Sequence, residues 1–239
     1  MDLSTSTVLV TGANRGFGRA LTNALRVQLA DQDILVAGLH VGYMDTDMTA
    51  GVTAHKSDPT DIARIAAIRG RTRGAGNELA LACDLRYASR EKAFFGQPEV
   101  GIGIVPGGGG TERLPRPIGR DRALEAILGS ADYDADVAER WGWVTRALPD
   151  AELDAFVDAT VARLASFDRQ ALATAKAMVN RATLPPDADL VTRYGEFVDS
   201  LTNPGYLVRA AALGALVADK GLDVEYHLGE YLGLANQTT

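Results

Sequence analysis

The sequence contains a single cysteine, Cys83, so no disulfide can form within the chain. Cys83 lies in the apolar run LALACDL, where we expect a buried small hydrophobic side chain. The first residues, MDLSTSTVLV, carry no basic leader, so we expect no secretory signal and a cytoplasmic protein. The apolar stretch at 210–218 is too short to span a bilayer, and we expect no membrane partner.

Positive charge is also scarce. The 24 lysine and arginine residues are outnumbered by 31 aspartate and glutamate residues, which gives a net charge of −7. Binding to nucleic acid requires a basic surface, so we expect no nucleic-acid partner. The length of 239 residues suits one large domain or two small ones.

A glycine-rich turn stands near the start of the chain. Residues 7–10 (TVLV) predict a buried parallel strand, TGANRGFG follows at 11–18, and leucines then recur at helical spacing. Strand, turn and helix form the opening of a dinucleotide-binding βα unit. In such a unit Gly12, Gly16 and Gly18 let the backbone approach a pyrophosphate at the helix N-terminus.

The segment TGANRGFG has the TGxxxGxG form and resembles the short-chain dehydrogenase/reductase family. By that resemblance Arg15 favours the 2′-phosphate of NADP. Residues 21–51 are similar to a much later part of the same family, and the middle of its fold is absent after Arg19. No tyrosine in the chain is followed by lysine four residues later, so the proton-transferring Tyr-x-x-x-Lys pair is missing. We therefore expect no dehydrogenase activity, and an NADP-binding remnant remains an alternative function.

From Ile68 onward the sequence changes character. GAGNELALACDL predicts a glycine turn at 74–76 that opens a short apolar helix. The first N–H groups of a helix have no partner within it, and with the helix dipole they favour negative charge. Such a helix start can stabilise an enolate formed from a thioester. Glu78 is expected in the first turn of this helix, close to that oxygen.

A second carboxylate follows at Glu99. CDLRYAS (83–89) alternates, AFFG (93–96) is a short apolar run, and QPEVGIG turns at Pro98. These elements can fold back and bring Glu99 opposite Glu78. Two carboxylates that face one cavity can add water across an activated double bond, because one deprotonates water and the other exchanges a proton at carbon.

Each of these residues also has an ordinary structural interpretation. Alone, Glu78 is a carboxylate favoured by a helix dipole, Glu99 is a surface turn residue, and the glycine run 107–110 is a flexible loop. Their order and spacing together favour a site.

The motifs GxGxELALACDLxxAS, FGQPEVGxGxxPGGGGTxRLPRxxGR and ADVAERWGWVTRALPD resemble the enoyl-CoA hydratase/isomerase (crotonase) family. The resemblance implies that Glu78 and Glu99 are the catalytic carboxylates, that the Ala75 N–H is an oxyanion-hole donor, and that Gly74 and Gly107 shape the substrate pocket. It implies an acyl-CoA substrate, with coenzyme A as part of that substrate and no metal or redox cofactor. It also implies a homo-oligomer of the trimer type.

The predicted fold class is α/β, with a truncated crotonase-like ββα core at 68–239 and a Rossmann-like βα element within short-chain dehydrogenase-like fragments at 1–67. The truncation is expected because family members carry a further segment before IRGRTRG that supplies the other oxyanion-hole donor. Abrupt changes near residues 20 and 67 suggest a chimeric chain. A non-catalytic partner in crotonase-type oligomers is therefore a third functional alternative.

Two helices are expected near the C-terminal end, at 152–167 and 169–182, and the prolines at 185–186 end the second. Trp141 and Trp143 are expected to be core or interface aromatics. No motif is found after Gly205.

Overall fold

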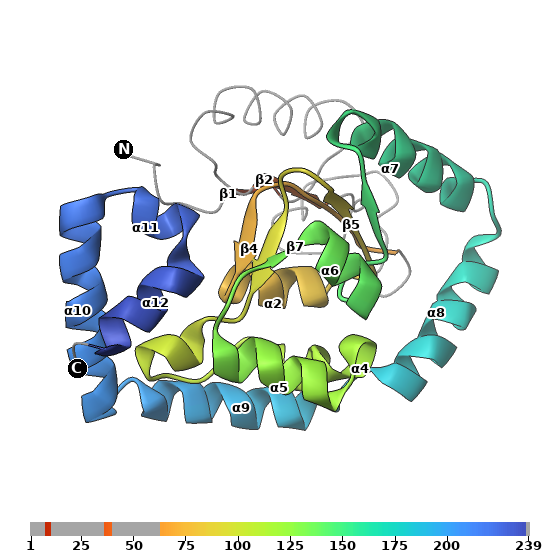
Figure 1. Ribbon diagram of the computed structural model, residues 1–239. Coiled ribbons are helices and arrows are strands. Elements are labelled where there is room, and N and C mark those ends of the chain that lie inside the picture. Colours follow the sequence, from red (N-terminus) through yellow and green to blue (C-terminus); the bar gives the residue numbers. More distant parts are fainter. Residues whose placement is uncertain (1–7, 11–35, 40–62, 238–239) are drawn as a thin grey trace, which may run out of the picture. The chain divides into compact units, whose positions relative to one another are not determined.

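Strand β3 (Ile65–Ile68) has four buried residues and occupies the centre of a five-stranded sheet. The computed structural model describes residues 8–10, 36–39 and 63–237 (Figure 1). β3 pairs in parallel with β5 (Leu85–Ser89), which pairs in parallel with β8 (Arg146–Leu148). A strand with apolar residues throughout suits this position, because both faces of a central parallel strand are covered.

The other side of β3 pairs with the early part of the chain. β2 (Val36–Leu39) runs antiparallel to β3 and parallel to β1 (Val8–Val10). The parallel strand predicted at 7–10 is thus present over Val8–Val10. The glycine turn and helix predicted after it lie outside the described residues, so the Rossmann-like element as a whole stays a prediction.

This sheet belongs to the first of two compact units, which comprises residues 1–71, 83–93 and 144–184. Helix α7 (Asp150–Ala165) packs on the sheet, and its Leu153 and Val157 join Ile65 and Tyr87 in one buried cluster. Helix α8 (Arg169–Thr183) follows, capped by the Asp168 carboxylate, which accepts a hydrogen bond from the Ala171 N–H at 2.8 Å. Both helices confirm the predicted ones, and Cys83 is buried as expected.

The second unit comprises residues 72–82, 94–143 and 185–239. Its small sheet has the order β4 (Arg71–Arg73), β6 (Phe94–Gly96) and β7 (Tyr133–Asp134). The helical elements between these strands are α2 (Ala75–Leu81), the 3₁₀ helix η3 (Glu99–Ile102), α3 (Gly110–Arg113), α4 (Pro115–Ile118), α5 (Arg120–Gly129) and, after β7, α6 (Ala135–Trp141).

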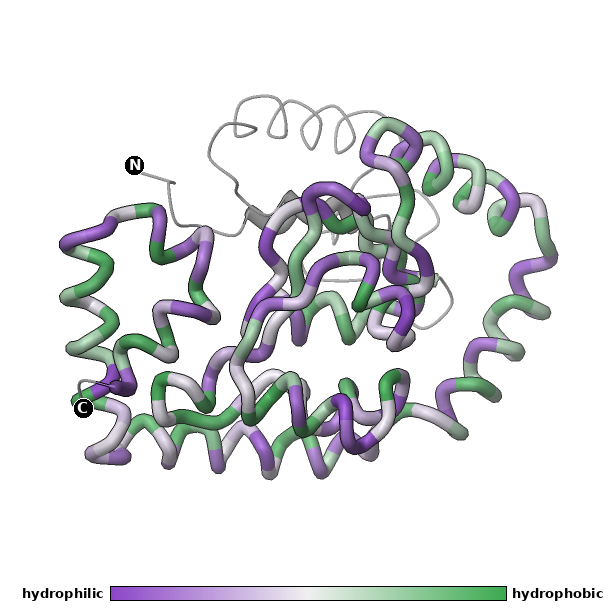
Figure 2. The backbone as a smooth tube through the Cα atoms, in the orientation of Figure 1, coloured by the Kyte–Doolittle hydropathy of each residue, from purple (hydrophilic) through white to green (hydrophobic). Residues whose placement is uncertain are grey.

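Four more helices complete the second unit: α9 (Asp187–Ser200), α10 (Pro204–Lys220), α11 (Asp223–Tyr226) and α12 (Leu228–Gln237). α10 and α12 pack against each other, and both contact η3 (Figure 1). Apolar and polar residues are interspersed along these helices (Figure 2), and α9 and α10 contain no fully buried residue.

An arginine ties the last helices to the small sheet. The Arg73 guanidinium forms ion pairs with Asp132 at 2.6 Å and with Glu225 at 2.9 Å, and its side chain is only 7% exposed. A nearly buried guanidinium with two carboxylate partners positions elements more firmly than a surface ion pair does. Within the described residues, no helix is both long and apolar enough to cross a membrane.

Candidate active site

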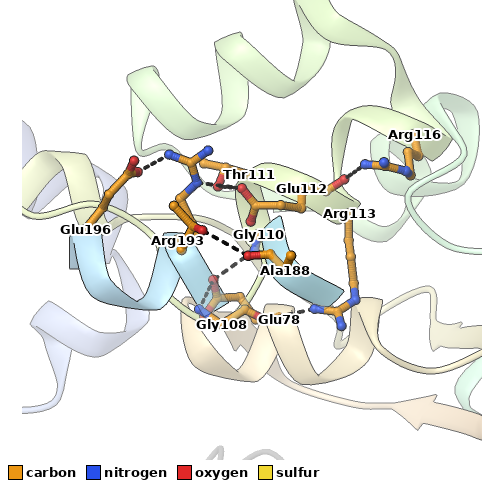
Figure 3. A network of polar contacts seen from close by, with 11 residues as sticks. Glu78, Gly108, Gly110, Thr111, Glu112, Arg113, Arg116, Ala188, Arg193 and Glu196 are labelled. Atoms are coloured by element: carbon orange, nitrogen blue, oxygen red, sulfur yellow. Dashed lines mark hydrogen bonds and ion pairs between the residues drawn. The ribbon is translucent and has the colours of Figure 1, made fainter. Parts of the chain in front are cut away.

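Glu78 is a buried carboxylate at the first turn of α2, with 6% of its surface exposed. Its Oε1 accepts hydrogen bonds from the N–H of Gly108 at 2.8 Å and of Gly110 at 2.9 Å (Figure 3). Two backbone donors on one oxygen fix the orientation of the side chain and suit the ionised form. The predicted position of Glu78 in the first helical turn is confirmed.

The glycine run 107–110 is shaped to receive this carboxylate. A Cβ atom on Gly108 would lie 2.5 Å from Glu78 Oε2, closer than any side chain permits. Gly109 has φ of +99°, a left-handed conformation that favours glycine. The run is therefore a loop shaped around Glu78 rather than a flexible linker, and it leads into α3.

Burial is the main influence on the protonation of Glu78. Desolvation raises its pKa, and the hydrogen bonds from Gly110 and Gly108 oppose that rise. Glu112 raises the pKa further and Arg113 lowers it. Glu78 is therefore desolvated but keeps the two backbone hydrogen bonds that stabilise its ionised form.

Glu99 is the first residue of η3, directly after Pro98. Its Oε2 accepts a hydrogen bond from the Gln97 side-chain amide at 3.0 Å. Gly74, with φ of +51°, lies so close that a Cβ on it would be 2.8 Å from Glu99 Oε1. Gly74 is thus required both for the turn that opens α2 and for the room that Glu99 occupies.

Desolvation raises the pKa of Glu99 to about 7, and the charge of Glu78 contributes to the rise. A backbone hydrogen bond and the Gln97 amide act in the opposite direction. A carboxyl group with a pKa near neutrality can both give and take a proton at physiological pH, which is the property expected of a general acid or base.

Glu78 and Glu99 face the same cavity, which has a volume of about 440 Å³. Ala75 and Gly107 also line it, so four of the predicted site residues lie at one cavity, with Gly74 against Glu99. The remaining lining is mostly apolar and comes from Pro98, Ile102, Ile104, Gly108, Tyr194, Phe197, Leu213, Leu228 and Leu232.

Several contributors to this site carried no recognisable signal in the sequence. The wall formed by α9, α10 and α12 comes from a part of the chain in which no helix was predicted and, after Gly205, no motif was found. The backbone donors of Gly108 and Gly110 were also missed, because a glycine run does not reveal which side chain it will face.

Charged side chains of arginine and glutamate surround the glycine loop. Arg113 donates to the Gly108 carbonyl at 3.0 Å, and Arg193 donates to the Glu112 carboxylate at 2.7 Å (Figure 3). The Thr111 hydroxyl donates to the same Glu112 oxygen at 2.8 Å. These contacts hold the start of α3, and with it the loop that binds Glu78.

The other predicted binding residues are Gly12, Arg15, Gly16 and Gly18. They lie outside the described residues, so NADP binding stays a prediction. Among the residues that the structure describes, no group of three or more His, Cys, Asp or Glu side chains could hold a metal ion.

The raised pKa of Glu99 makes a prediction about stability. The fold favours the neutral carboxyl group, so this contribution to stability is complete below the ordinary pKa of 4.5 and is lost as the pH rises through about 7. Glutamine is neutral throughout and keeps an oxygen that can accept from Gln97. We expect Glu99→Gln to be more stable than the parent at pH 8.5, by about 1–3 kcal/mol, with a smaller difference at pH 5.

Urea denaturation at the two pH values measures this difference. Glu125→Gln is a matched control, because Glu125 is exposed on α5 of the same unit. A free-energy change for Glu99→Gln that is the same at both pH values would contradict the expectation.

Comparison with known proteins identifies relatives of this arrangement. The sequence profile of the enoyl-CoA hydratase/isomerase family matches residues 33–196. A Mycobacterium tuberculosis protein named "Probable enoyl-CoA hydratase echA8" is 35% identical over 181 residues, which cover 76% of this chain and 66% of the relative. A Streptomyces avermitilis crystal structure, assigned to the enoyl-CoA hydratases, matches with a TM-score of 0.70 at 48% identity, over 72% of this chain and 62% of that one.

A Thermobifida fusca structure of the same assignment, in complex with acetoacetyl-CoA, matches with a TM-score of 0.50 at 37% identity, over 56% of this chain and 52% of that one. This chain thus spans less than two thirds of the length of the relatives, from 52% to 66%. The profile match begins upstream of Ile68, at residue 33, and covers more than half of the 239 residues. The chain therefore belongs to the enoyl-CoA hydratase/isomerase family.

Proposed function

We propose that this protein hydrates enoyl-CoA thioesters. The observation that carries the proposal is the cavity that Glu78 and Glu99 share, with one carboxylate held by two backbone N–H groups and the other raised to a pKa of about 7. Hydration needs a base for water and an acid for carbon within reach of one double bond. The apolar wall suits the acyl part of such a substrate.

The roles of the two carboxylates follow from their surroundings. Glu78, which accepts two backbone hydrogen bonds, takes a proton from water. The oxygen of that water bonds to the β-carbon of the enoyl group. Glu99, with its pKa near neutrality, gives a proton to the α-carbon. One water is consumed, the double bond is lost, and the product is a 3-hydroxyacyl thioester. Glu78 then releases the proton it gained and Glu99 takes one up, by exchange with solvent, before the next turnover.

The negative charge that develops on the thioester oxygen needs a donor. Ala75 is the first residue of α2 and lines the cavity, and the first N–H groups of a helix are not used within it. We assign the Ala75 N–H to this oxygen, and Gly74 and Gly107 to the shape of the pocket around it. Coenzyme A enters as part of the substrate, and the reaction uses the protein's own carboxylates.

The direct test is an assay of the purified chain with a short-chain trans-2-enoyl-CoA. We expect the ultraviolet absorbance of the conjugated thioester to fall and, in heavy water, one deuterium to appear at the α-carbon of the product. A product of unchanged mass with a displaced double bond would indicate isomerisation instead. No turnover and no thioester binding, together with a rise in melting temperature on adding NADPH, would favour the dehydrogenase remnant.

A further inference from the structure

Three buried polar side chains stand in a row behind Glu99. The Trp143 indole N–H donates to Asn77 Oδ1 at 2.8 Å, Asn77 Nδ2 donates to Gln97 Oε1 at 2.6 Å, and Gln97 Nε2 donates to Glu99 Oε2 at 3.0 Å. Trp143, Asn77 and Gln97 each have 0% exposure. Buried polar groups need partners, and here each one is satisfied by the next.

All the hydrogen bonds in the row are donated in the same direction, toward Glu99. The indole of Trp143, at the end away from Glu99, sets that direction. An indole N–H can only donate, so Asn77 must present its oxygen to Trp143 and its amide nitrogen to Gln97. Gln97 must then present its own oxygen to Asn77 and its amide nitrogen to Glu99. With the opposite amide orientation Gln97 would turn an oxygen toward the carboxylate, a contact that only a protonated Glu99 could satisfy.

The ends of the row are held by packing. The Trp143 ring lies between Phe95, at 5.9 Å between ring centroids, and Tyr133, at 5.8 Å. The Gln97 amide lies against Gly110, where an added Cβ would be 2.9 Å from its Cδ atom. Neither end can shift without displacing neighbours, so a change at one end is transmitted to the other.

We propose that Trp143, Asn77 and Gln97 form a one-directional hydrogen-bond relay that holds the Glu99 carboxylate in its working orientation. They are positioning residues, since they act through Glu99 and do not line the cavity. The relay rests on the proposed function for its effect on turnover. Its existence as a hydrogen-bonded unit is independent of that function and is tested separately.

The relay also affects the pH at which Glu99 titrates. The other groups around Glu99 affect that pH as well. Among the described residues, Glu78 of α2 is the charged group that acts on Glu99. Helices α10 and α12, which pack against η3, bring Leu213, Leu228 and Leu232 to the cavity, all of them apolar, whereas α5, which also packs against η3, does not line it. Loss of the Gln97 donor should therefore move the titration of Glu99 to higher pH, because the apolar neighbours cannot replace the lost hydrogen bond.

The test begins with Trp143→Phe, which keeps an aromatic ring and removes the donor. We expect kcat for enoyl-CoA hydration to fall by about three- to tenfold with little change in KM. We also expect the alkaline limb of the pH–rate profile to move to higher pH. The matched control is Trp141→Phe, the same substitution two residues earlier, where the ring packs on Tyr133 and takes no part in the relay. Equal effects of the two substitutions would overturn the proposal.

A double-mutant cycle separates positioning from general damage to the fold. In a Gln97→Met background the relay is already cut, so adding Trp143→Phe should change kcat by no more than about twofold. A structural role for Trp143 predicts the same loss in both backgrounds, and that result would refute the relay.

The relay is also visible without turnover. In the parent protein the Trp143 indole N–H, told apart from that of Trp141 with the Trp141→Phe variant, should exchange slowly with solvent. Its nitrogen-15 NMR signal should shift as the pH passes through about 7, where Glu99 titrates. A signal that shifts in a protein without hydratase activity would sink the proposed function and keep the relay. A signal that exchanges freely and does not shift would remove the relay.

Discussion

Glu78→Gln and Glu99→Gln are each expected to lower kcat for hydration by about a hundredfold to ten-thousandfold. The amide has nearly the shape of the carboxylate, and its oxygen can still accept the hydrogen bonds that Glu78 receives from Gly108 and Gly110. The amide cannot, however, take the proton from water or give one to the α-carbon. The loss should therefore appear in kcat rather than in substrate affinity.

The two substitutions should act as one unit. Water addition needs both proton movements on the same substrate, so the double variant should be little worse than either single one. Steady-state assays with the enoyl-CoA, alongside circular dichroism to confirm folding, measure this. Glu125→Gln, an exposed carboxylate on α5, should retain the parent rate. Near-parent activity of either site variant would remove that residue from the mechanism.

The second large effect is expected at Ala75. Ala75→Pro deletes the one backbone N–H that we assign to the thioester oxygen, at the helix position where proline is best tolerated. Gly74 before it is outside the α region, with φ of 51° and ψ of −124°, so the restriction that proline places on its predecessor is respected. We expect kcat to fall by about a hundredfold to a thousandfold.

Ala75→Gly is the matched control for this prediction, because it changes the side chain and keeps the N–H. It should stay within about threefold of the parent, since the donor belongs to the main chain. Both variants should bind a saturated acyl-CoA with similar affinity if the donor acts mainly on the transition state. Equal losses in the proline and glycine variants would show that the side chain matters and the N–H does not.

Local patterns predicted the elements that carry the carboxylates. The helix that begins after Gly74, the strand within 83–89 and the turn at Pro98 are all present, and they bring Glu78 and Glu99 to one cavity. These elements lie close together in the sequence. Spacing along a short segment largely determines which side chains can meet. This is why the meeting of Glu78 and Glu99 could be predicted.

The rest of the site depends on partners far apart in the chain. No helix was predicted around Leu213 or Leu232, and a helical pattern would not have shown which surface its apolar face covers. The bond from Trp143 to Asn77 joins residues 66 positions apart, and no local pattern encodes it. The meeting of Glu78 and Glu99 at one cavity could therefore be predicted, whereas the groups that contact them from elsewhere in the chain could not.

This separation along the chain has a kinetic consequence. Glu78, Glu99 and the loop at 107–110 come from one short stretch, whereas the wall that completes the cavity comes from helices α9, α10 and α12. Bringing these helices to the cavity closes a long segment of chain, and this costs conformational entropy that local contacts do not offset. Elements that are far apart in the sequence are therefore expected to pack together late in folding. We therefore expect Glu78, Glu99 and the loop at 107–110 to come together early in renaturation, before helices α9, α10 and α12 enclose the cavity.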